Sequence, residues 1–275
     1  MNKKNKERHK PYVPNLGIKY PEKTDEHMDL LPKIYDTVFD ENYPYLDKTF
    51  KFKLWSGFIY FAIWTLVFIV SPIRFCLRIE GRGILRKHRK LLKNGAMTAA
   101  NHVMRWDFLC VLQAMRYRRL YFPALAYNIN TADRGVIRAV GGIPVPEGVH
   151  AMQQFNAAFD ELHARKKWLH AFPEASSWDY YQPIRPFKKG VFTIAHRYNL
   201  PVIPMAFSWR PPTGIYRLFK KGHPLVTLRI GEPILPDLTL PRKEAVNLLR
   251  EKCHKAVIEL AGIKEGTNPY PCEGD

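Results

Sequence analysis

The sequence predicts an α/β fold in which a mixed central sheet is flanked by helices and is preceded by an N-terminal membrane-associated helical segment. Short apolar runs of strand length alternate with longer segments of helical periodicity, which is the pattern of α/β domains. The chain has 275 residues, 46% of them hydrophobic, enough for one core of ordinary size. We expect a polar extension over residues 1–50, an apolar membrane-associated segment over 51–75 and one domain over 76–275.

The extension is polar, contains prolines and carries both signs of charge, with short apolar patches at Leu30-Leu31 and Ile34-Tyr35. This composition predicts an extended segment with one short helix, and we assign no chemistry to it. Residues 1–10 are basic but no continuous apolar run follows them, so we expect no cleavable signal peptide.

The apolar segment contains no charged residue between Leu54 and Ile73, and this stretch is long enough to cross a bilayer as a helix. Basic residues flank it on both sides, at Lys51 before it and at Arg74 after it. Because a spanning helix normally has asymmetric flanks, this symmetry favours a helix that re-enters one leaflet or lies in the interface. A buried core helix is the other alternative, since small and polar residues shorten the strongly apolar part. Contact with lipid is expected in either membrane arrangement.

The domain opens with a strand over residues 75–80, where apolar and polar side chains alternate. Gly81-Arg82-Gly83 then makes a turn, but the third glycine of a dinucleotide-binding fingerprint is missing. Residues 86–93 are densely basic and form either a solvated face or a site for anionic headgroups.

The second strand, over residues 96–100, is short and apolar. A helix is expected over residues 107–115, because Leu109, Leu112 and Met115 fall on one stripe. The residues between this strand and this helix therefore lie in a turn.

The middle of the domain contains a strand over residues 121–127, a short helix over 132–140 that ends at Gly141-Gly142, and a longer helix over 149–164. We interpret the apolar stripe of the longer helix as core packing; it consists of Met152, Phe155, Phe159 and Leu162.

The last strands are expected over residues 168–172, 202–207 and 225–230. A helix is expected over residues 188–198 between them. Pro241 opens a final helix that ends at Gly262. Its apolar stripe consists of Val246, Leu249, Cys253, Val257 and Leu260.

The chain is strongly basic, with 43 Lys and Arg against 25 Asp and Glu and a net charge of +18, which favours anionic partners such as lipid headgroups or nucleic acid. We expect no nucleic acid, because the charge is scattered and no recognition motif is present. The four cysteines form no Cys-x-x-Cys or Cys/His cluster. This predicts a reducing compartment, no disulfide framework and no metal site.

The turn after the second strand carries Asn101 and His102, with Asp107 at the start of the next helix. A neutral histidine can take a proton from an alcohol, and a carboxylate can fix its tautomer and stabilise the imidazolium. On a regular helix five residues would rotate the two side chains apart by about 140°, so a loop is needed to bring them together. Free backbone N–H groups at the helix start are candidate oxyanion donors. The pair predicts acyl transfer to a hydroxyl, with His102 as general base and Asp107 as its orienting carboxylate.

Such a pair also occurs by chance, so the blocks that follow it decide the interpretation. The remaining histidines that we considered have no acidic partner at this spacing and receive no role; they include His150, His163, His170 and His196. The later blocks, in order, are Gly141-Gly142-Ile143-Pro144, Phe172-Pro173-Glu174-Ala175-Ser176-Ser177, Phe187-Lys188-Lys189-Gly190 and Val202-Ile203-Pro204.

Together with Asn101-His102-x4-Asp107, this order resembles the glycerolipid acyltransferase family typified by 1-acylglycerol-3-phosphate O-acyltransferase. The likeness runs from Ile79 to Ile234. The domain over residues 76–275 is then an acyltransferase domain.

Two departures from the family pattern concern the acceptor. The second block of the family usually ends in an arginine that is thought to hold the acceptor phosphate, and Glu147 stands at that position. The third block lacks the usual glycine, since Ala175 follows Glu174, and it also lacks the usual arginine. Either another cation replaces them, or the acceptor carries no phosphate monoester. The candidate cations are Arg105, Arg134, Arg138, Arg185 and Lys189.

The resemblance implies transfer of a fatty acyl group from acyl-CoA or acyl-carrier protein to the free hydroxyl of a lysophospholipid in phospholipid biosynthesis. It implies direct transfer without a covalent acyl-enzyme, a metal or another cofactor. His102 and Asp107 would be catalytic. The residues implied in substrate binding are Asn101, Arg105, Gly142, Glu174, Ser176, Lys188 and Lys189.

The expected partners are membrane lipids and the acyl donor, and the expected location is the cytoplasmic face of a membrane, as an integral or monotopic protein. The oligomeric state stays open. Two alternatives remain: an acyltransferase for an acceptor without phosphate, and a non-enzymatic basic protein that binds anionic membrane or nucleic acid.

Overall fold

The computed structural model describes residues 12–28, 32–70, 73, 75–116, 118–146, 148–220 and 222–272. Its centre is a seven-stranded sheet. The strands are β1 (Arg78–Glu80), β2 (Met97–Ala100), β3 (Leu120–Ala124), β4 (Gly142–Pro144), β5 (Trp168–Ala171), β6 (Val202–Arg210) and β7 (Leu225–Ile230). Their order across the sheet is β1-β7-β6-β2-β5-β3-β4.

Neighbouring strands run parallel except for β6 and β7, which pair antiparallel with Met205 opposite Ile230. In the parallel centre Met97 of β2 lies between Leu169 of β5 and Val202 of β6. The carboxyl ends of β2, β3, β4, β5 and β6 therefore share one edge of the sheet, where α/β proteins place functional side chains.

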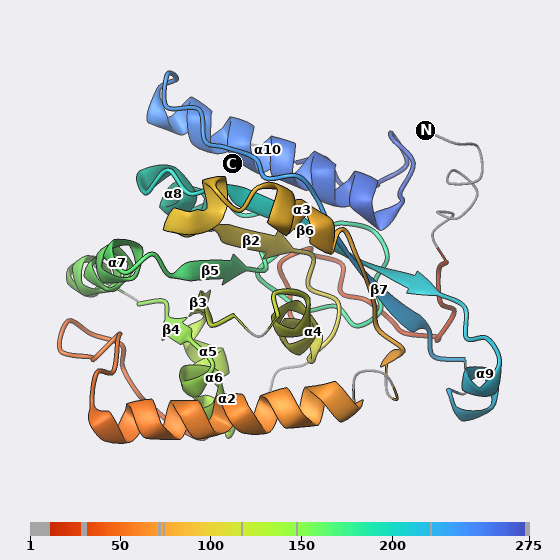
Figure 1. Cartoon of the computed structure of the whole chain (residues 1–275), viewed down its shortest axis with the longest axis horizontal. Coiled ribbons are helices and arrows are strands. Elements are labelled where there is room, and N and C mark those ends of the chain that lie inside the picture. The colour runs from red at the N-terminus through yellow and green to blue at the C-terminus, as the bar shows by residue number, and fades with distance from the viewer. Residues whose placement is uncertain are drawn as a thin grey trace.

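The helices cover both faces of the sheet. They are α2 (Phe50–Val70), α3 (Arg82–Lys87), α4 (Asp107–Ala114), α5 (Ala126–Ile129), α6 (Arg134–Ala139), α7 (Val149–Ala164), α8 (Gly190–Arg197), α9 (Ile215–Phe219) and α10 (Arg242–Ala261), with a short 3-10 helix at Leu91–Asn94. In Figure 1, α8 and α10 lie on one side of the sheet, and α4 lies on the other side with α2 beyond it.

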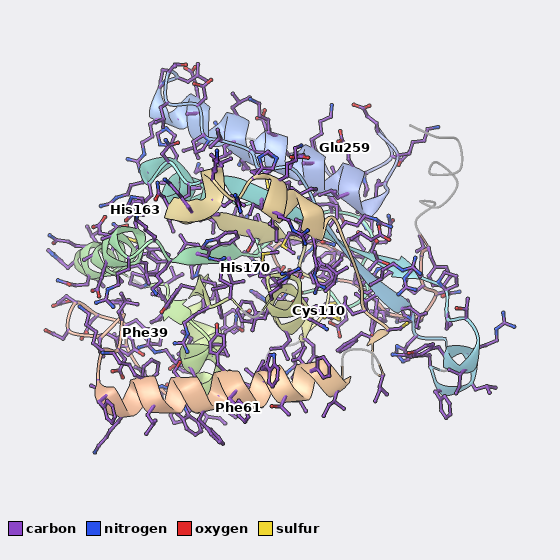
Figure 2. All side chains as sticks on the ribbon, viewed as in Figure 1. Phe39, Phe61, Cys110, His163, His170 and Glu259 are labelled. Carbon is purple, nitrogen blue, oxygen red and sulfur yellow. The ribbon has the colours of Figure 1, made fainter. Side chains whose placement is uncertain are left out.

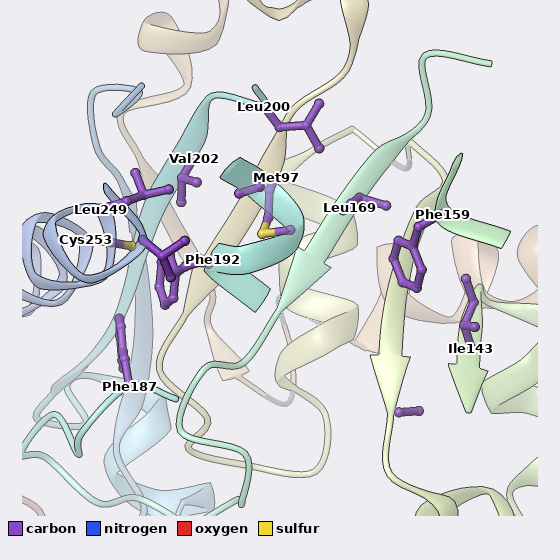
Figure 3. Close-up of a cluster of buried hydrophobic side chains, with 14 of the residues drawn as sticks. Met97, Ile143, Phe159, Leu169, Phe187, Phe192, Leu200, Val202, Leu249 and Cys253 are labelled. Atoms are coloured by element: carbon purple, nitrogen blue, oxygen red, sulfur yellow. The ribbon is translucent and has the colours of Figure 1, made fainter. Parts of the chain in front are cut away.

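The two faces bury two separate cores, and the alternation along β2 assigns its side chains to them. Met97 and Ala99 belong to the core under α7, α8 and α10, whereas Ala96 and Ala100 belong to the core under α4. Figure 3 shows part of the first core. The prediction of an α/β fold with a mixed sheet between helices is confirmed.

Two predicted elements change in the structure. The strand expected over residues 121–127 ends at Ala124 and α5 begins at Ala126, because β4, the partner of β3 at this edge, is only three residues long. The predicted turn at Gly81 leads directly into α3. Gly81 has φ +85°, and a Cβ there would lie 2.3 Å from the carbonyl oxygen of Ile230, so the close approach to β7 requires glycine.

The extension contains no helix in its described part, residues 12–28 and 32–49, so the expected short helix is not found there. The Leu30-Leu31 patch lies outside the described residues. The chain instead lies extended against the domain: the N–H groups of Ile34 and Tyr35 donate to the carbonyl oxygen of Asn130, and Phe39 is part of a core.

Helix α2 lies along the domain and is attached on one side. Ser56 Oγ donates to the carbonyl oxygen of Ala139 at 2.5 Å, Tyr60 Oη donates to that of Val140 at 3.0 Å, and Ile63 is buried. The opposite side is apolar and exposed, as the outward position of Phe61 illustrates (Figure 2). Residues Phe50–Ile69 are long and apolar enough to cross a membrane by length and composition, and an 18-residue stretch within them is 17% buried.

Candidate active site

The sheet brings the first and third sequence blocks together. β2 and β5 are parallel neighbours, and their carboxyl ends lead directly into Asn101-His102 and Phe172-Pro173-Glu174. Backbone hydrogen bonds also connect the two blocks. The N–H groups of Trp178 and Tyr180 donate to the carbonyl oxygens of His102 and Val103.

His102 and Asp107 form a hydrogen-bonded pair, with 2.6 Å between His102 Nδ1 and Asp107 Oδ2. The side chain of Asp107 is 1% exposed and that of His102 is 24% exposed. The same Oδ2 also accepts the N–H groups of Val103 at 3.0 Å and of Met104 at 3.4 Å. The turn before α4 thus fixes the carboxylate, and the carboxylate fixes the imidazole, as the spacing predicted.

The ring of His102 stacks on Phe172, with the centroids 4.2 Å apart and the planes at 11°. Nδ1 is committed to Asp107, and Nε2 has no hydrogen-bond partner among the described residues. Since a carboxylate at Nδ1 favours the tautomer with its proton there, Nε2 is left with the lone pair that a general base needs.

A buried ion pair between Arg185 and Glu174 supports the backbone of His102. Arg185 Nη2 lies 2.7 Å from Glu174 Oε2, and both side chains are 1% exposed. Glu174 also accepts the backbone N–H of His102 at Oε2 and that of Arg185 at Oε1, both at 3.0 Å. Burial raises the pKa of Glu174, and the Arg185 guanidinium and the two N–H groups oppose this. Glu174 therefore holds the backbone of His102.

The guanidinium of Arg185 links three segments, which are the third block, the extension and the turn that carries His102. Besides Glu174 it donates to the hydroxyl and the carbonyl oxygen of Ser176, to the carbonyl oxygen of Thr24 at 3.0 Å and to that of His102 at 3.4 Å. It also lies over the ring of Trp178, 4.5 Å from its centroid. Glu174 and Ser176, which the sequence predicted as substrate-binding, are buried parts of this support because Arg185 occupies their polar atoms.

Asn101 and Gly142 are also engaged within the fold rather than presented to a ligand. Asn101 Oδ1 accepts the N–H of Phe207 at 2.7 Å, and its Nδ2 donates to the Phe207 carbonyl oxygen at 3.3 Å. Gly142 begins β4, where a Cβ would lie 2.6 Å from a side-chain carbon of Ile137. Close packing of α6 on β4 therefore explains this glycine.

The basic residues predicted to bind substrate differ in whether their charged groups already form ion pairs. Arg105 forms an ion pair with Asp133 at the surface. Lys188 and Lys189 are exposed, and their ammonium groups make no ion pair with a described residue. The N–H of Lys188 donates to the carbonyl oxygen of Pro173 at 2.8 Å, which places this lysine beside the third block.

The cations that could replace the missing family arginine are mostly engaged. Arg185 is buried, Arg138 donates to the carbonyl oxygens of Pro44 and Tyr45, and Arg134 donates to Thr37 Oγ1. Glu147, at the position of that arginine, lies outside the described residues. Of these candidates, Lys189 is the one without a described partner.

The backbone donors expected to bind an oxyanion are largely paired. Val103 and Met104 donate to Asp107, and the N–H groups of Asp107 and Leu109 donate to the carbonyl oxygens of Met104 and Trp106. These N–H groups therefore stabilise the turn that holds the Asp107 carboxylate. The sequence alone could not reveal this pairing.

His170, to which we gave no role, is fully buried at the end of β5 next to the site. Its ring meets the edge of Phe172 with centroids 4.4 Å apart, and its Nδ1 lies 2.8 Å from Thr98 Oγ1. Burial and the charge of His102 lower its pKa to about 3.

Sequence reasoning missed the supporting residues. It treated Arg185 only as a candidate cation for phosphate, gave Trp178 no part and assigned no chemistry to the extension that carries Thr24. The described residues contain no group of three or more His, Cys, Asp or Glu that could hold a metal.

Of the comparisons with known proteins, the one with family models agrees with the sequence blocks. None of the curated proteins matches this chain. Among solved structures, the crystal structure of the 1-acyl-sn-glycerophosphate (LPA) acyltransferase PlsC from Thermotoga maritima is similar, with 21% identity and a TM-score of 0.48. The match covers 78% of this chain and 84% of that one. Residues 77–208, which include His102, Asp107 and Glu174, match the family model described as Acyltransferase, so this part of the chain is an acyltransferase domain.

Proposed function

We propose that this protein transfers a fatty acyl group from acyl-CoA or acyl-carrier protein to the free hydroxyl of a lysophospholipid, 1-acylglycerol-3-phosphate or a related acceptor, with His102 as general base. The observation that carries the proposal is the pair of His102 and a buried Asp107, 2.6 Å apart, within a domain of the acyltransferase family. A base with an oriented tautomer is what attack by an alcohol on a thioester requires.

In this mechanism Nε2 of His102 takes the hydroxyl proton as the acceptor oxygen attacks the thioester carbonyl carbon. A carbon–oxygen bond forms, the carbon–sulfur bond breaks, and the imidazolium returns its proton to the leaving thiolate. Asp107 stabilises the imidazolium throughout. General base catalysis contributes about 10²- to 10⁴-fold, so the positioning of two substrates must supply much of the remaining acceleration.

The acyl donor carries an anionic phosphopantetheine arm, and Lys188 and Lys189 are the residues that we assign to it. Both are exposed, lack a described ion-pair partner and lie beside the third block. Unpaired ammonium groups at such a position attract a phosphate without having to break an existing ion pair.

An acceptor without a phosphate monoester is the second candidate. It is favoured by the engagement of Arg105 with Asp133, of Arg134 with Thr37 and of Arg185 with Glu174. At Arg105 and at Arg185 a phosphate would have to share the guanidinium with a carboxylate that is already bound.

We propose that α2 lies in the membrane interface, as in a monotopic protein, on the cytoplasmic face. Ser56 and Tyr60 attach it sideways to the end of α6, and Ile63 and Val67 are buried against the domain. A helix attached along its length in this way can offer lipid only its outer face, which is apolar.

The experiment is an acceptor screen with labelled oleoyl-CoA and purified protein in detergent. The acceptors are 1-oleoyl-lysophosphatidate, other lysophospholipids and 1-oleoylglycerol. Acyl transfer to a lysophospholipid that His102→Ala abolishes, while the variant keeps the wild-type unfolding transition, supports the proposal. Transfer at the wild-type rate by His102→Ala refutes the assigned base, and transfer to 1-oleoylglycerol alone favours the second candidate.

A further inference from the structure

Residues 20–27 of the extension, here called the strap, lie across the third sequence block. Tyr20 Oη donates to the carbonyl oxygen of Asp179 at 3.0 Å, and its ring stacks on that of Trp178 with centroids 5.8 Å apart. Trp178 Nε1 in turn donates to the carbonyl oxygen of Glu26 at 2.8 Å. The strap is therefore tied at both ends to the loop that supports His102.

One guanidinium sets the distance between the strap and the base. Arg185 donates through Nη1 to the carbonyl oxygen of Thr24 and through Nη2 to that of His102. Since the two nitrogens belong to one planar group, the backbones of Thr24 and His102 are neighbours across it. The strap therefore runs beside the turn that carries His102.

The side chain of His27 is held in place by the domain and keeps one ring nitrogen unpaired within the described part of the chain. Its Nδ1 lies 2.7 Å from Tyr127 Oη, and the two rings meet at 63° with centroids 4.6 Å apart. Tyr127 belongs to α5, which follows the carboxyl end of β3 at the same sheet edge as His102. The Nε2 of His27 has no hydrogen-bond partner among the described residues and is not buried.

We propose that the strap forms the acceptor side of the site and that His27, held by Tyr127, donates Nε2–H to an oxygen of the acceptor headgroup. The inference rests on the proposed function, and it names a binding residue for the acceptor. The oxygen is a hydroxyl or a phosphate oxygen, because both accept an N–H donor.

The tautomer and charge of His27 fit this role. The role requires Tyr127 Oη to donate to Nδ1, so that the proton of the neutral ring is on Nε2. Burial and the charges of His102 and Arg185 lower the pKa of His27, whereas Asp25 raises it. A neutral donor can hold the acceptor without adding a positive charge beside the imidazolium that forms at His102.

The test is equilibrium binding to the full-length protein in detergent, which needs no turnover. Titration calorimetry with 1-oleoyl-lysophosphatidate and with 1-oleoylglycerol distinguishes a phosphate oxygen from a hydroxyl, and oleoyl-CoA tests the donor side. We expect His27→Ala to weaken acceptor binding about tenfold, the equivalent of one hydrogen bond, and to leave oleoyl-CoA binding unchanged. Loss of binding for lysophosphatidate alone identifies the phosphate, and equal loss for both identifies a hydroxyl.

Three variants keep the test decisive. His27→Gln, whose amide replaces the Nε2–H donor, should restore binding to within about threefold, and Tyr127→Phe should weaken it. His150→Ala, on the exposed surface of α7, is the matched control and should bind like wild type. Wild-type acceptor affinity in His27→Ala, or no acceptor binding by the wild-type protein, overturns the inference. Acyl transfer abolished by His102→Ala would still support the proposed function in that case.

Discussion

The rings of His102 and Phe172 stack almost parallel, 4.2 Å apart, while Asp107 holds the edge of the same imidazole through Nδ1. The two contacts restrain different motions: the stack limits rotation of the ring out of its plane, and the hydrogen bond fixes the position of Nδ1 within that plane. Because Phe172 follows β5 and His102 follows β2, the register of two neighbouring strands sets the orientation of the base.

The first prediction concerns the carboxylate that orients the base. Asp107→Asn keeps the size of the side chain but removes its charge, so the imidazolium loses its stabilisation and the tautomer is no longer fixed. We expect the kcat for acyl transfer to fall by about 10²- to 10⁴-fold with little change in the KM for either substrate. Steady-state kinetics check this, and a kcat within a factor of two of wild type would contradict the role of Asp107.

The second prediction concerns the buried ion pair. Arg185→Met leaves the Glu174 carboxylate buried without its counterion, so we expect the free energy of unfolding to fall by about 3–5 kcal/mol. Combining it with Glu174→Gln removes the stranded charge and should recover part of the loss. Urea unfolding measures both. Arg197→Met, which breaks the exposed pair with Asp160, is the control and should cost less than about 1 kcal/mol.

The third prediction follows from a backbone conformation in the third block. Ala175 has φ +63°, in the left-handed region that disfavours a Cβ, and it stands where the family pattern has glycine. Its side chain is exposed, so Ala175→Gly loses no packing. We expect a gain of up to about 1 kcal/mol in the free energy of unfolding, because relief of the strain exceeds the added entropy of the unfolded chain.

Urea unfolding of Ala175→Gly checks this gain, and Ala157→Gly provides the control. Ala157 is exposed in the middle of α7, where glycine should destabilise by about 1 kcal/mol. Equal losses in the two variants would show that the conformation at Ala175 carries no strain.

The sequence predicted best those helices and strands in which the pattern of apolar side chains repeats several times. The helix over residues 149–164 and the strand over 225–230 have the bounds of α7 and β7. β4 and α9 were missed because they span three and five residues, too few to repeat a pattern. The strand expected over 121–127 was too long because its pairing ends with β4, which depends on the fold and not on local residues.

The candidate site was predictable only where it is local. The spacing of His102 and Asp107 placed both in one turn, and the structure brings them together. Glu174 was expected to bind a substrate because its block resembles the third block of the family. Its ion-pair partner, Arg185, was not foreseen. Arg185 lies eleven positions further along the chain, and a long-range ion pair leaves no periodic signal.

The fourth prediction concerns the outer face of α2. Phe58 and Phe61 are exposed there, and the transfer of each side chain from water into lipid would contribute about 1.5–3 kcal/mol to membrane binding. We expect Phe58→Glu combined with Phe61→Glu to lower partitioning onto anionic phosphatidylglycerol vesicles by about 100-fold or more. Vesicle flotation measures this, and Val149→Glu, at a more exposed position on α7, should float like wild type. Wild-type flotation of the double variant would exclude α2 from the lipid contact.

The fifth prediction concerns pH and the buried His170. Its pKa is about 3 in the folded protein, against 6.5 for the free side chain, because burial disfavours the imidazolium. Between these values the unfolded chain binds a proton that the folded protein does not, so the free energy of unfolding decreases as the pH falls below 6.5. From pH 7 to pH 5 this one residue should cost about 2 kcal/mol of stability.

His170→Phe isolates that contribution, because the new ring fits among Phe108 and Phe172 and cannot be protonated. Burial also lowers the pKa of His27 and His254, so the wild-type protein loses stability in acid for several reasons, and the difference between the two proteins is the informative quantity. We expect urea unfolding at pH 7, 6 and 5 to show a loss about 2 kcal/mol smaller for the variant. His150→Phe, at an exposed position, should follow the wild-type curve. Parallel curves for wild type and His170→Phe would mean that His170 binds a proton inside the fold, with Thr98 as the hydrogen-bond acceptor beside it.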